Sequence, residues 1–277
     1  MTFSGASWWK VDIHTHTPAS TDFGKRSPER ENLRETTPSA WLLAFMGSGI
    51  QAVVVTDHNS GVWIDPLKAA LVALTRDRPD GFRPLTLFPG VEITANSGAH
   101  VLAVFSPDAT TATIDALLGA VHYRGARGSS DVAADASPIV VVNEIIAAGG
   151  IPILAHLDAA DNSAFTTRAN TLGPLLDAAG LHAIEVCSPA SWTPPEIYRE
   201  RPPLAHVLGS DSHHLRGGAG QRFPGSHERA RSSGSRWIAS TWSRNSRARS
   251  VKTRSSLPWS RRSFACGFPA PTAPIAR

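Results

Sequence analysis

Short apolar runs that end in polar residues recur along the first 215 residues of the chain. Runs of this kind are typical of buried strands, and amphipathic stretches between them predict helices. The expected strands are Trp9–Ile13, Ala52–Thr56, Thr86–Glu92, His100–Phe105, Ile151–Ala155, Ala183–Cys187 and Ala205–Gly209. The expected helices are Pro38–Gly49, Asp65–Arg76, Thr113–Tyr123, Ile139–Gly149 and Thr171–Gly180. Seven strands alternating with helices favour a parallel α/β barrel over a small open sheet.

Two segments depart from this alternation. Gly125–Pro138 is rich in Gly, Ser, Ala and Asp, and it is predicted to be a surface insertion. Residues 216–277 are rich in Arg and Ser and keep no apolar period, so we expect this tail to be disordered. We interpret it as a truncated or out-of-frame end of a longer gene. The predicted domains are therefore 1–215, which is folded, and the tail 216–277.

The charge is divided in the same way. The net charge of +4 combines about +12 in residues 216–277 with about −8 in residues 1–215. An acidic body can hold cations, whereas a basic tail favours non-specific contact with nucleic acid.

The cellular compartment is inferred from three features that the sequence lacks, namely a membrane span, a secretory signal and a set of cysteines for disulfides. There is no run of 18 apolar residues, so we expect no membrane span. Met1–Lys10 has no pattern of a secretory signal, and the cysteines, Cys187 and Cys266, are too few for a disulfide scaffold. We expect a cytoplasmic protein, and the sequence leaves its oligomeric state open.

Histidines and acids follow the apolar runs. His14 and His16 stand two residues apart after the first run, so they share one side of a strand. In barrels the carboxyl ends of strands carry the active site. Asp57 and His58 follow the second run, and because neighbours on a strand point oppositely, we expect His58 to bind metal and Asp57 to orient it.

Later runs repeat this arrangement. Glu92 ends the third strand and can bridge two cations, His100 opens the fourth, His156 follows the fifth, and Asp211 and His213 share a face after the seventh. Each residue alone has an ordinary structural or surface interpretation, but repetition at five strands indicates a metal centre. Imidazole and carboxylate ligands suit Zn²⁺, Mn²⁺ or Fe, and so many ligands predict two or three ions.

The order of these motifs, HxH, TDH, GxE, His, AH and GSDSH, resembles that of the polymerase and histidinol phosphatase (PHP) superfamily over residues 1–215. The resemblance implies a distorted (βα)7 TIM-like barrel of the PHP type, with a trinuclear metal centre at its carboxyl face. It also implies hydrolysis of phosphomonoesters or phosphodiesters. The opening Trp8–Ser20 is similar to the amino-terminal PHP domain of TrlF-like ATPases, but the chain has no GxxxxGK[ST] phosphate loop.

Carried over by motif, the resemblance implies three ligand sets. The first is His14, His16, Glu92 and Asp211; the second is Glu92, His100 and His156; the third is Asp22, His58 and His213. Asp22 lies where many members place a histidine or another ligand. The implied catalytic residues are Asp57, His58, Glu92 and Asp211.

The expected function is hydrolysis of a phosphate ester by metal-activated hydroxide, on a phosphorylated small molecule, a nucleotide or a nucleic-acid end. Lys25, Arg26 and Arg34 are candidate phosphate contacts or ordinary solvated charges. One alternative is a catalytically weak PHP module of a truncated ATPase-associated protein that binds nucleotide or nucleic acid. Another is an amide hydrolase on a related barrel, although no expected strand ends in the bridging Lys of such enzymes.

Overall fold

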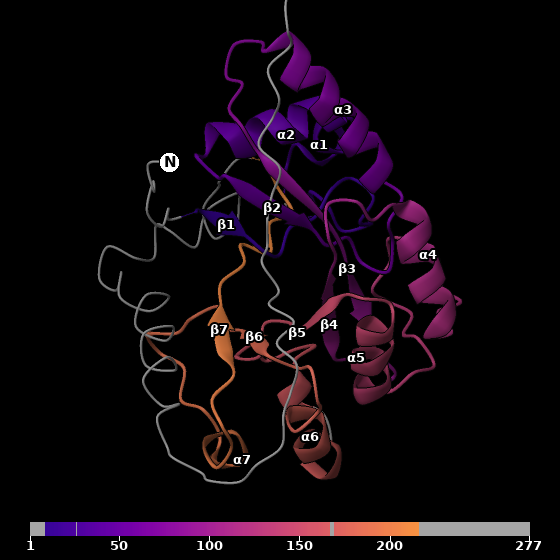
Figure 1. The fold of residues 1–277 in the computed structure, drawn as a ribbon, viewed down its shortest axis with the longest axis vertical. Helices are drawn as coiled ribbons and strands as arrows, with labels where there is room; N and C mark the ends of the chain where they lie inside the picture. Colours follow the sequence, from indigo (N-terminus) through magenta and orange to yellow (C-terminus); the bar gives the residue numbers. More distant parts are fainter. Residues whose placement is uncertain (1–8, 26, 167–168, 216–277) are drawn as a thin grey trace, which may run out of the picture.

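The computed structural model describes residues 9–25, 27–166 and 169–215 (Figure 1). Its centre is one seven-stranded sheet in which the strands follow each other in sequence order. They are β1 (Val11–Asp12), β2 (Ala52–Val55), β3 (Thr86–Thr94), β4 (His100–Val104), β5 (Ile151–Leu154), β6 (Ala183–Glu185) and β7 (Ala205–Val207). All seven expected strands are confirmed, with ends that shift by a few residues.

The direction of β4 differs from the expected parallel sheet. β1, β2 and β3 are parallel, and so are β5, β6 and β7, but β4 is antiparallel to both β3 and β5. Only residues 95–99 join β3 to β4, which is too short for the crossover that a parallel pair needs. Because β4 runs backwards, its first residue, His100, lies at the edge where the parallel strands end.

The sheet curls until the segments after β1 and β7 meet. The Asp211 backbone N–H donates to the His14 carbonyl at 2.8 Å, and the His16 N–H donates to the Ser212 carbonyl at 3.0 Å. On the other side of the same segment, the Thr56 N–H donates to the Thr15 carbonyl at 2.9 Å. The predicted TIM-like barrel architecture is therefore confirmed, with the contact between its first and last strands made at this edge.

Helices cover the outside of the sheet (Figure 1). They are α1 (Arg30–Arg34), α2 (Pro38–Gly47), α3 (Ile64–Asp77), α4 (Thr111–Ala120), α5 (Pro138–Ala147), α6 (Ala169–Leu176) and α7 (Glu196–Arg199), with a 3₁₀ turn at Ala164–Thr166. The five expected helices are confirmed, whereas α1 and α7 are too short to show a helical period. α2 begins as the sequence indicates, with the Thr37 side chain capping it and Pro38 in its first turn.

Two clusters of buried apolar residues hold the helices to the sheet. One packs Trp41 and Phe45 of α2 against Val53 of β2 and Leu67 of α3. The larger one packs α4, α5 and α6 against the other half of the sheet. Both clusters hold the strands to the helices on the outer face of the sheet. The edge with the polar residues is not part of these clusters.

The segment Gly125–Pro138 is only in part the surface insertion that its composition predicts, because Arg127 and Val132 are exposed but other residues pack into the molecule. Its Gly128 carbonyl accepts from the Thr21 N–H at 2.8 Å, and its Ser129 carbonyl accepts from the Asn59 amide at 2.9 Å. The Ala134 N–H donates to the Thr94 carbonyl at 2.8 Å, and both Ser129 and Ala134 are buried. Its small residues allow close backbone approach, so the segment joins the loops that follow β1, β2 and β3.

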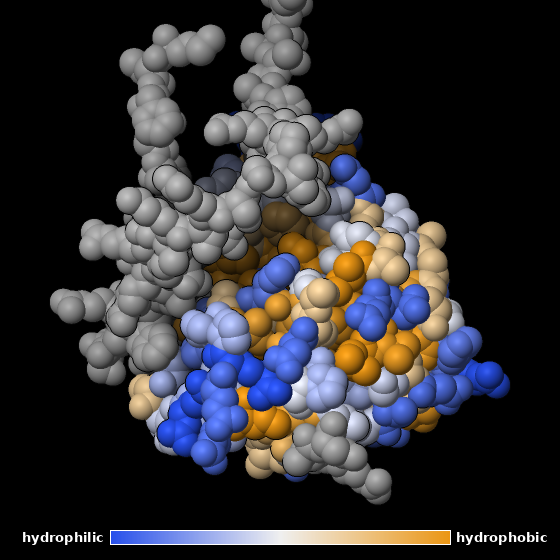
Figure 2. Space-filling model, turned by 60° about the horizontal axis from the view of Figure 1, so that its bottom comes forward, coloured by the Kyte–Doolittle hydropathy of each residue, from blue (hydrophilic) through white to orange (hydrophobic). Residues whose placement is uncertain are grey.

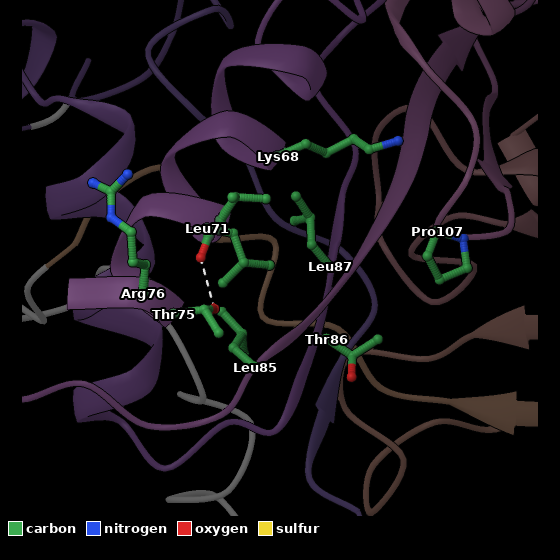
Figure 3. A pocket seen from close by; sticks show the side chains of 9 residues that line it. Lys68, Leu71, Thr75, Arg76, Leu85, Thr86, Leu87 and Pro107 are labelled. Atoms are coloured by element: carbon green, nitrogen blue, oxygen red, sulfur yellow. Dashed lines mark hydrogen bonds between the residues drawn. The ribbon is translucent and has the colours of Figure 1, made fainter. Parts of the chain in front are cut away.

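The outer surface is mixed. On the face that carries α6 and α7, hydrophobic residues lie between hydrophilic ones (Figure 2). A hollow of about 580 Å³ lies between α3 and the start of β3, with Leu71 and Leu87 in its wall (Figure 3). It lies toward the beginning of β3, away from Glu92. Among the described helices, none has the length and apolarity needed to span a membrane.

Candidate metal centre

The predicted ligands converge at the edge where the parallel strands end and β4 begins. The structure brings all nine together, namely His14, His16, Asp22, His58, Glu92, His100, His156, Asp211 and His213. Glu92 is fully buried in the middle, and its carboxylate lies within 3.4 Å of ring nitrogens from five histidines.

Strand alternation places the first pair. The Thr15 hydroxyl points back toward β2 and donates to the Val54 carbonyl at 2.6 Å. His14 and His16, on either side of it, therefore face the centre together, with their Nε2 atoms 3.2 Å apart.

The first predicted ligand set forms a tight group of donors. Glu92 Oε2 lies 3.2 Å from His14 Nε2 and 3.4 Å from His16 Nε2. Asp211 Oδ1 lies 3.6 Å and 3.3 Å from the same two atoms. His14, His16 and Glu92 offer ligand atoms that all lie within 4.8 Å of one another, as metal ligands do.

The second and third sets flank the first. Glu92 Oε1 lies 2.7 Å from His100 Nδ1 and 3.1 Å from His156 Nε2. Asp22 Oδ2 lies 3.4 Å from His58 Nε2 and 3.1 Å from His213 Nε2. Because His58 Nδ1 is also 2.9 Å from Glu92 Oε2, the third set is continuous with the first.

Buried polar atoms that make no hydrogen bond of good geometry test whether these residues fit metal ions. Among the described residues they are Asp22 Oδ1, His58 Nδ1, Glu92 Oε2, Glu185 Oε1, His100 Nε2, His156 Nδ1 and His213 Nε2. The close contacts of His58 Nδ1, Glu92 Oε2 and His213 Nε2 are those given above, between imidazoles and carboxylates. Six of these atoms belong to the predicted ligands. Native proteins leave few such atoms unsatisfied, and divalent cations would satisfy imidazole nitrogens and carboxylate oxygens. The donor set therefore fits metal binding.

The shifts in pKa of the buried residues also support metal binding. Burial would raise the pKa of the Glu92 carboxyl, but the neighbouring His14, His100 and His58 hold it well below its ordinary value. Burial would lower the pKa of His58, but the Glu92 and Asp22 carboxylates raise it to about 10. By contrast, burial lowers the pKa of His16 to about 3, helped by the charges of His213 and His58. The carboxylates are thus ionised and require nearby positive charge.

Glu185 is a residue that sequence reasoning missed. It is fully buried, and its Oε2 lies 2.8 Å from His14 Nδ1 and accepts from the His156 backbone N–H at 2.9 Å. Gly209 makes room for it, since a Cβ there would overlap the Glu185 carboxylate and the His14 side chain. The signal was weak, because the expected strand Ala183–Cys187 placed Glu185 in its interior, whereas β6 ends at Glu185.

Asp57 lies next to the metal ligands and contacts two of the histidines through Ser20. Its carboxylate accepts from the Thr17 N–H and hydroxyl, both at 2.7 Å, and from the Ser20 hydroxyl at 2.8 Å. Ser20 Oγ in turn lies 3.0 Å from His16 Nδ1. The same Ser20 Oγ accepts from the His58 backbone N–H at 3.1 Å, so Asp57 acts through Ser20 on the His16 ring and on the backbone of His58, the histidine that we predicted it to orient.

The basic residues after β1 hold a loop. Arg34 donates to the Ser20 carbonyl at 2.6 Å, and Arg30 donates to the Thr21 carbonyl at 3.1 Å. These contacts give Arg34 a structural role beside Asp22. Arg26, another candidate phosphate contact, lies outside the described residues.

Comparison with known proteins gives structural matches alone, since no family model and no curated protein sequence matches the chain. One match is a Bifidobacterium adolescentis protein proposed to be a metal-dependent phosphoesterase, with 17% identity and a TM-score of 0.51 over 81% of this chain and 96% of that one. Another is the lesion-specific endonuclease Q of Pyrococcus furiosus, with 15% identity and a TM-score of 0.53 over 75% of this chain and 49% of that one. Endonuclease Q in complex with a 27-mer duplex carrying an abasic lesion matches with 15% identity and a TM-score of 0.50, over 75% of this chain and 50% of that one.

These matches show a shared fold. They agree with the PHP-type barrel that the motifs predict, while the closer likeness to TrlF-like proteins stays a prediction. The chain spans about half the length of the endonuclease Q structures, so it corresponds to one part of that enzyme.

Proposed function

We propose that the protein is a metal-dependent phosphoesterase whose centre holds two or three divalent ions of Zn, Mn or Fe. The observation that carries this proposal is the arrangement around Glu92, where three sets of imidazole and carboxylate donors share one buried carboxylate. The names of the structural neighbours support it, since one is a proposed metal-dependent phosphoesterase and the other an endonuclease. Both names describe cleavage of phosphate esters.

When bound, such ions would supply a water of lowered pKa and positive charge for the phosphate oxygens, which is the usual basis of multinuclear phosphoester hydrolysis. Glu92 would help to hold these ions together with the histidines, because one of its oxygens faces His14 and the other faces His100.

The surrounding residues would keep the donors in place before substrate arrives. Glu185 fixes the ring of His14 through Nδ1, which leaves Nε2 directed at Glu92 and Asp211. Ser20 does the same for His16 and is itself held by Asp57. Such supporting contacts commonly set the orientation and basicity of metal-bound imidazoles.

One side of the centre is open to substrate. The side chains of Asp22, Asp211 and His213 are 30%, 25% and 20% exposed, whereas Glu92 is 1% exposed. A phosphate group would therefore approach over Asp211 and His213. The acidic body favours a small phosphorylated substrate over a long nucleic acid.

Activity and metal dependence in one preparation test this proposal. The full chain would be stripped with a chelator, reloaded with Zn²⁺, Mn²⁺ or Fe²⁺, and assayed on a chromogenic phosphomonoester and phosphodiester. We expect turnover in at least one reloaded sample, and its loss in the His14→Ala/His16→Ala double variant. His122→Ala, at an exposed histidine away from the centre, is the matched control and should keep full turnover.

The opposite result is equally clear. A folded protein that binds the ions but cleaves neither ester would contradict the proposal and support the alternative of a non-catalytic binding module.

A further inference from the structure

A second hollow, of about 370 Å³, lies where the chain leaves β5 and β6. Asp158, Cys187, Ser188, Ser191, Trp192 and Thr193 line it. Asp158 follows His156 by two residues, and Cys187 follows Glu185 by two. Because β5 and β6 are parallel neighbours, both loops leave the sheet at the edge that carries the metal centre, so the hollow and the centre lie at the same edge.

Hydrogen bonds between the lining residues fix the shape of the hollow. The Asp158 carboxylate accepts from the Cys187 N–H at 2.8 Å and from the Ser188 N–H at 2.6 Å, which ties the two loops together. The Trp192 N–H donates to the Ser188 carbonyl at 3.0 Å. These bonds hold the lining residues in one arrangement, and a preformed cavity is the usual state of a small-molecule site.

Two aromatic rings, those of Tyr198 and Phe165, pack against Trp192. Its ring centroid lies 5.5 Å from that of Tyr198 and 6.3 Å from that of Phe165, whose plane is nearly parallel. The indole, which lines the hollow, is therefore held in place by these rings. The hydroxyls of Ser188, Ser191 and Thr193 provide polar groups beside it.

The charge of the lining decides which part of a substrate fits there. No Lys or Arg is among the residues described as lining the hollow, and Asp158 brings a carboxylate. A phosphate group would be repelled there, while the neighbouring centre is suited to anions once cations are bound. The hollow is thus suited to an uncharged ring with hydroxyls.

We propose that this hollow binds the nucleoside part of a nucleoside monophosphate, with the base on Trp192 and the ribose near the serine and threonine hydroxyls. The inference rests on the proposed function, because it assigns the phosphate of the same molecule to the metal centre. The size agrees, since about 370 Å³ lies near the lower end of the range of roughly 300–1,000 Å³ for ligand pockets and suits one small molecule.

Protection of Cys187 tests the hollow without any catalysis. In a Cys266→Ser background Cys187 is the single cysteine, so its alkylation rate by iodoacetamide reports on the hollow. We expect millimolar adenosine to slow this alkylation severalfold. In a Thr193→Trp variant, whose new ring would fill the hollow from an exposed position, adenosine should have no effect. Equal alkylation of the parent protein with and without adenosine would overturn the proposal.

Kinetics test the same hollow during turnover. Trp192→Ala should raise KM for a nucleoside 5′-monophosphate by about 5- to 100-fold, the usual effect of removing an aromatic ring that stacks on a base. Its KM for methyl phosphate should stay within twofold. Trp9→Ala, at an exposed tryptophan before β1, is the matched control and should change neither value.

The two proposals can fail separately. Equal changes in KM for both esters, or none, would refute the nucleoside site while the phosphoesterase stands. Absence of turnover on every ester would refute the phosphoesterase, and the alkylation experiment would then decide alone whether the hollow binds a nucleoside.

Discussion

Glu185 and Ser20 show how single side chains set the histidines of the centre. Glu185 contacts His14 Nδ1 at 2.8 Å, and Ser20 Oγ contacts His16 Nδ1 at 3.0 Å, so both Nε2 atoms face the same point. Without these partners each ring could rotate and offer either nitrogen. The preorganisation of the centre is therefore carried by residues outside the nine predicted ligands.

Glu185→Gln should weaken metal binding by about 10- to 100-fold, because the neutral amide no longer stabilises the positive charge that His14 acquires on binding. Metal titration monitored by calorimetry measures this affinity. Glu196→Gln, at an exposed glutamate of α7, is the matched control and should bind as the parent does. An affinity within twofold of the parent in Glu185→Gln would rule out this role.

Metal binding at pH 7 should release protons. The pKa of His58 is raised to about 10 by Glu92 and Asp22, despite burial, so the metal-free site keeps this proton at neutral pH. A cation that binds the His58 ring must displace it, and affinity should therefore rise as the pH rises toward 10. Calorimetry in buffers of different ionisation enthalpy counts the protons released. Affinity that is constant from pH 7 to 9 would contradict this assignment.

The sequence could predict ligands but not their supports. His14, His16, His58 and His156 follow strands in a repeated pattern, and repetition is visible in one dimension. Glu185 ends a strand as well, but nothing local shows that its partner is a histidine 171 residues away. The same holds for Asp57, whose link to His16 depends on where the loop of Ser20 turns.

At the scale of elements, local pattern gave the strands but not all of their directions. The five residues between β3 and β4 were enough to exclude a crossover, and this constraint predicts the antiparallel β4 in retrospect. The segment Gly125–Pro138 was harder, because its small polar residues suit a surface loop as well as a tight backbone contact. Only its bonds to the Thr21, Asn59 and Thr94 regions show that it is part of the centre's support.

Gly128→Ala should therefore destabilise the protein strongly. A Cβ at this position would overlap the Ala19 carbonyl, and the backbone φ of +85° is itself unfavourable for alanine. Gly98→Ala is the matched control, since its φ is +84° and an added Cβ would meet nothing within 4 Å. Urea unfolding should show a loss of about 1 kcal/mol for the control and about 1–3 kcal/mol more for Gly128→Ala. Equal losses of unfolding free energy in the two variants would show that Gly125–Pro138 does not pack closely against the loop after β1.

At the scale of the whole molecule, the described residues contain all seven expected strands and every predicted ligand. The predicted boundary at residue 215 and the predicted disorder of 216–277 concern a tail that lies outside the described residues. The charge division at the same boundary, acidic before it and basic after it, is a property of the sequence alone.

A chain shortened to residues 1–215 should fold and bind the same number of metal ions as the full chain. The reason is that the described residues of the sheet, of both apolar clusters and of the centre all precede residue 216. Circular dichroism and metal analysis of both chains measure this. Loss of the folded signal or of bound metal in the shortened chain would show that the tail is needed.

The most direct test of the central claim is a crystal structure of the protein grown with Mn²⁺ or Zn²⁺ and measured at the absorption edge of the metal. We expect two or three anomalous peaks around Glu92, roughly 3.5–4 Å apart, each in contact with one of the three ligand sets. A well-ordered crystal with no peak among these residues, or with a single isolated one, would contradict the central claim.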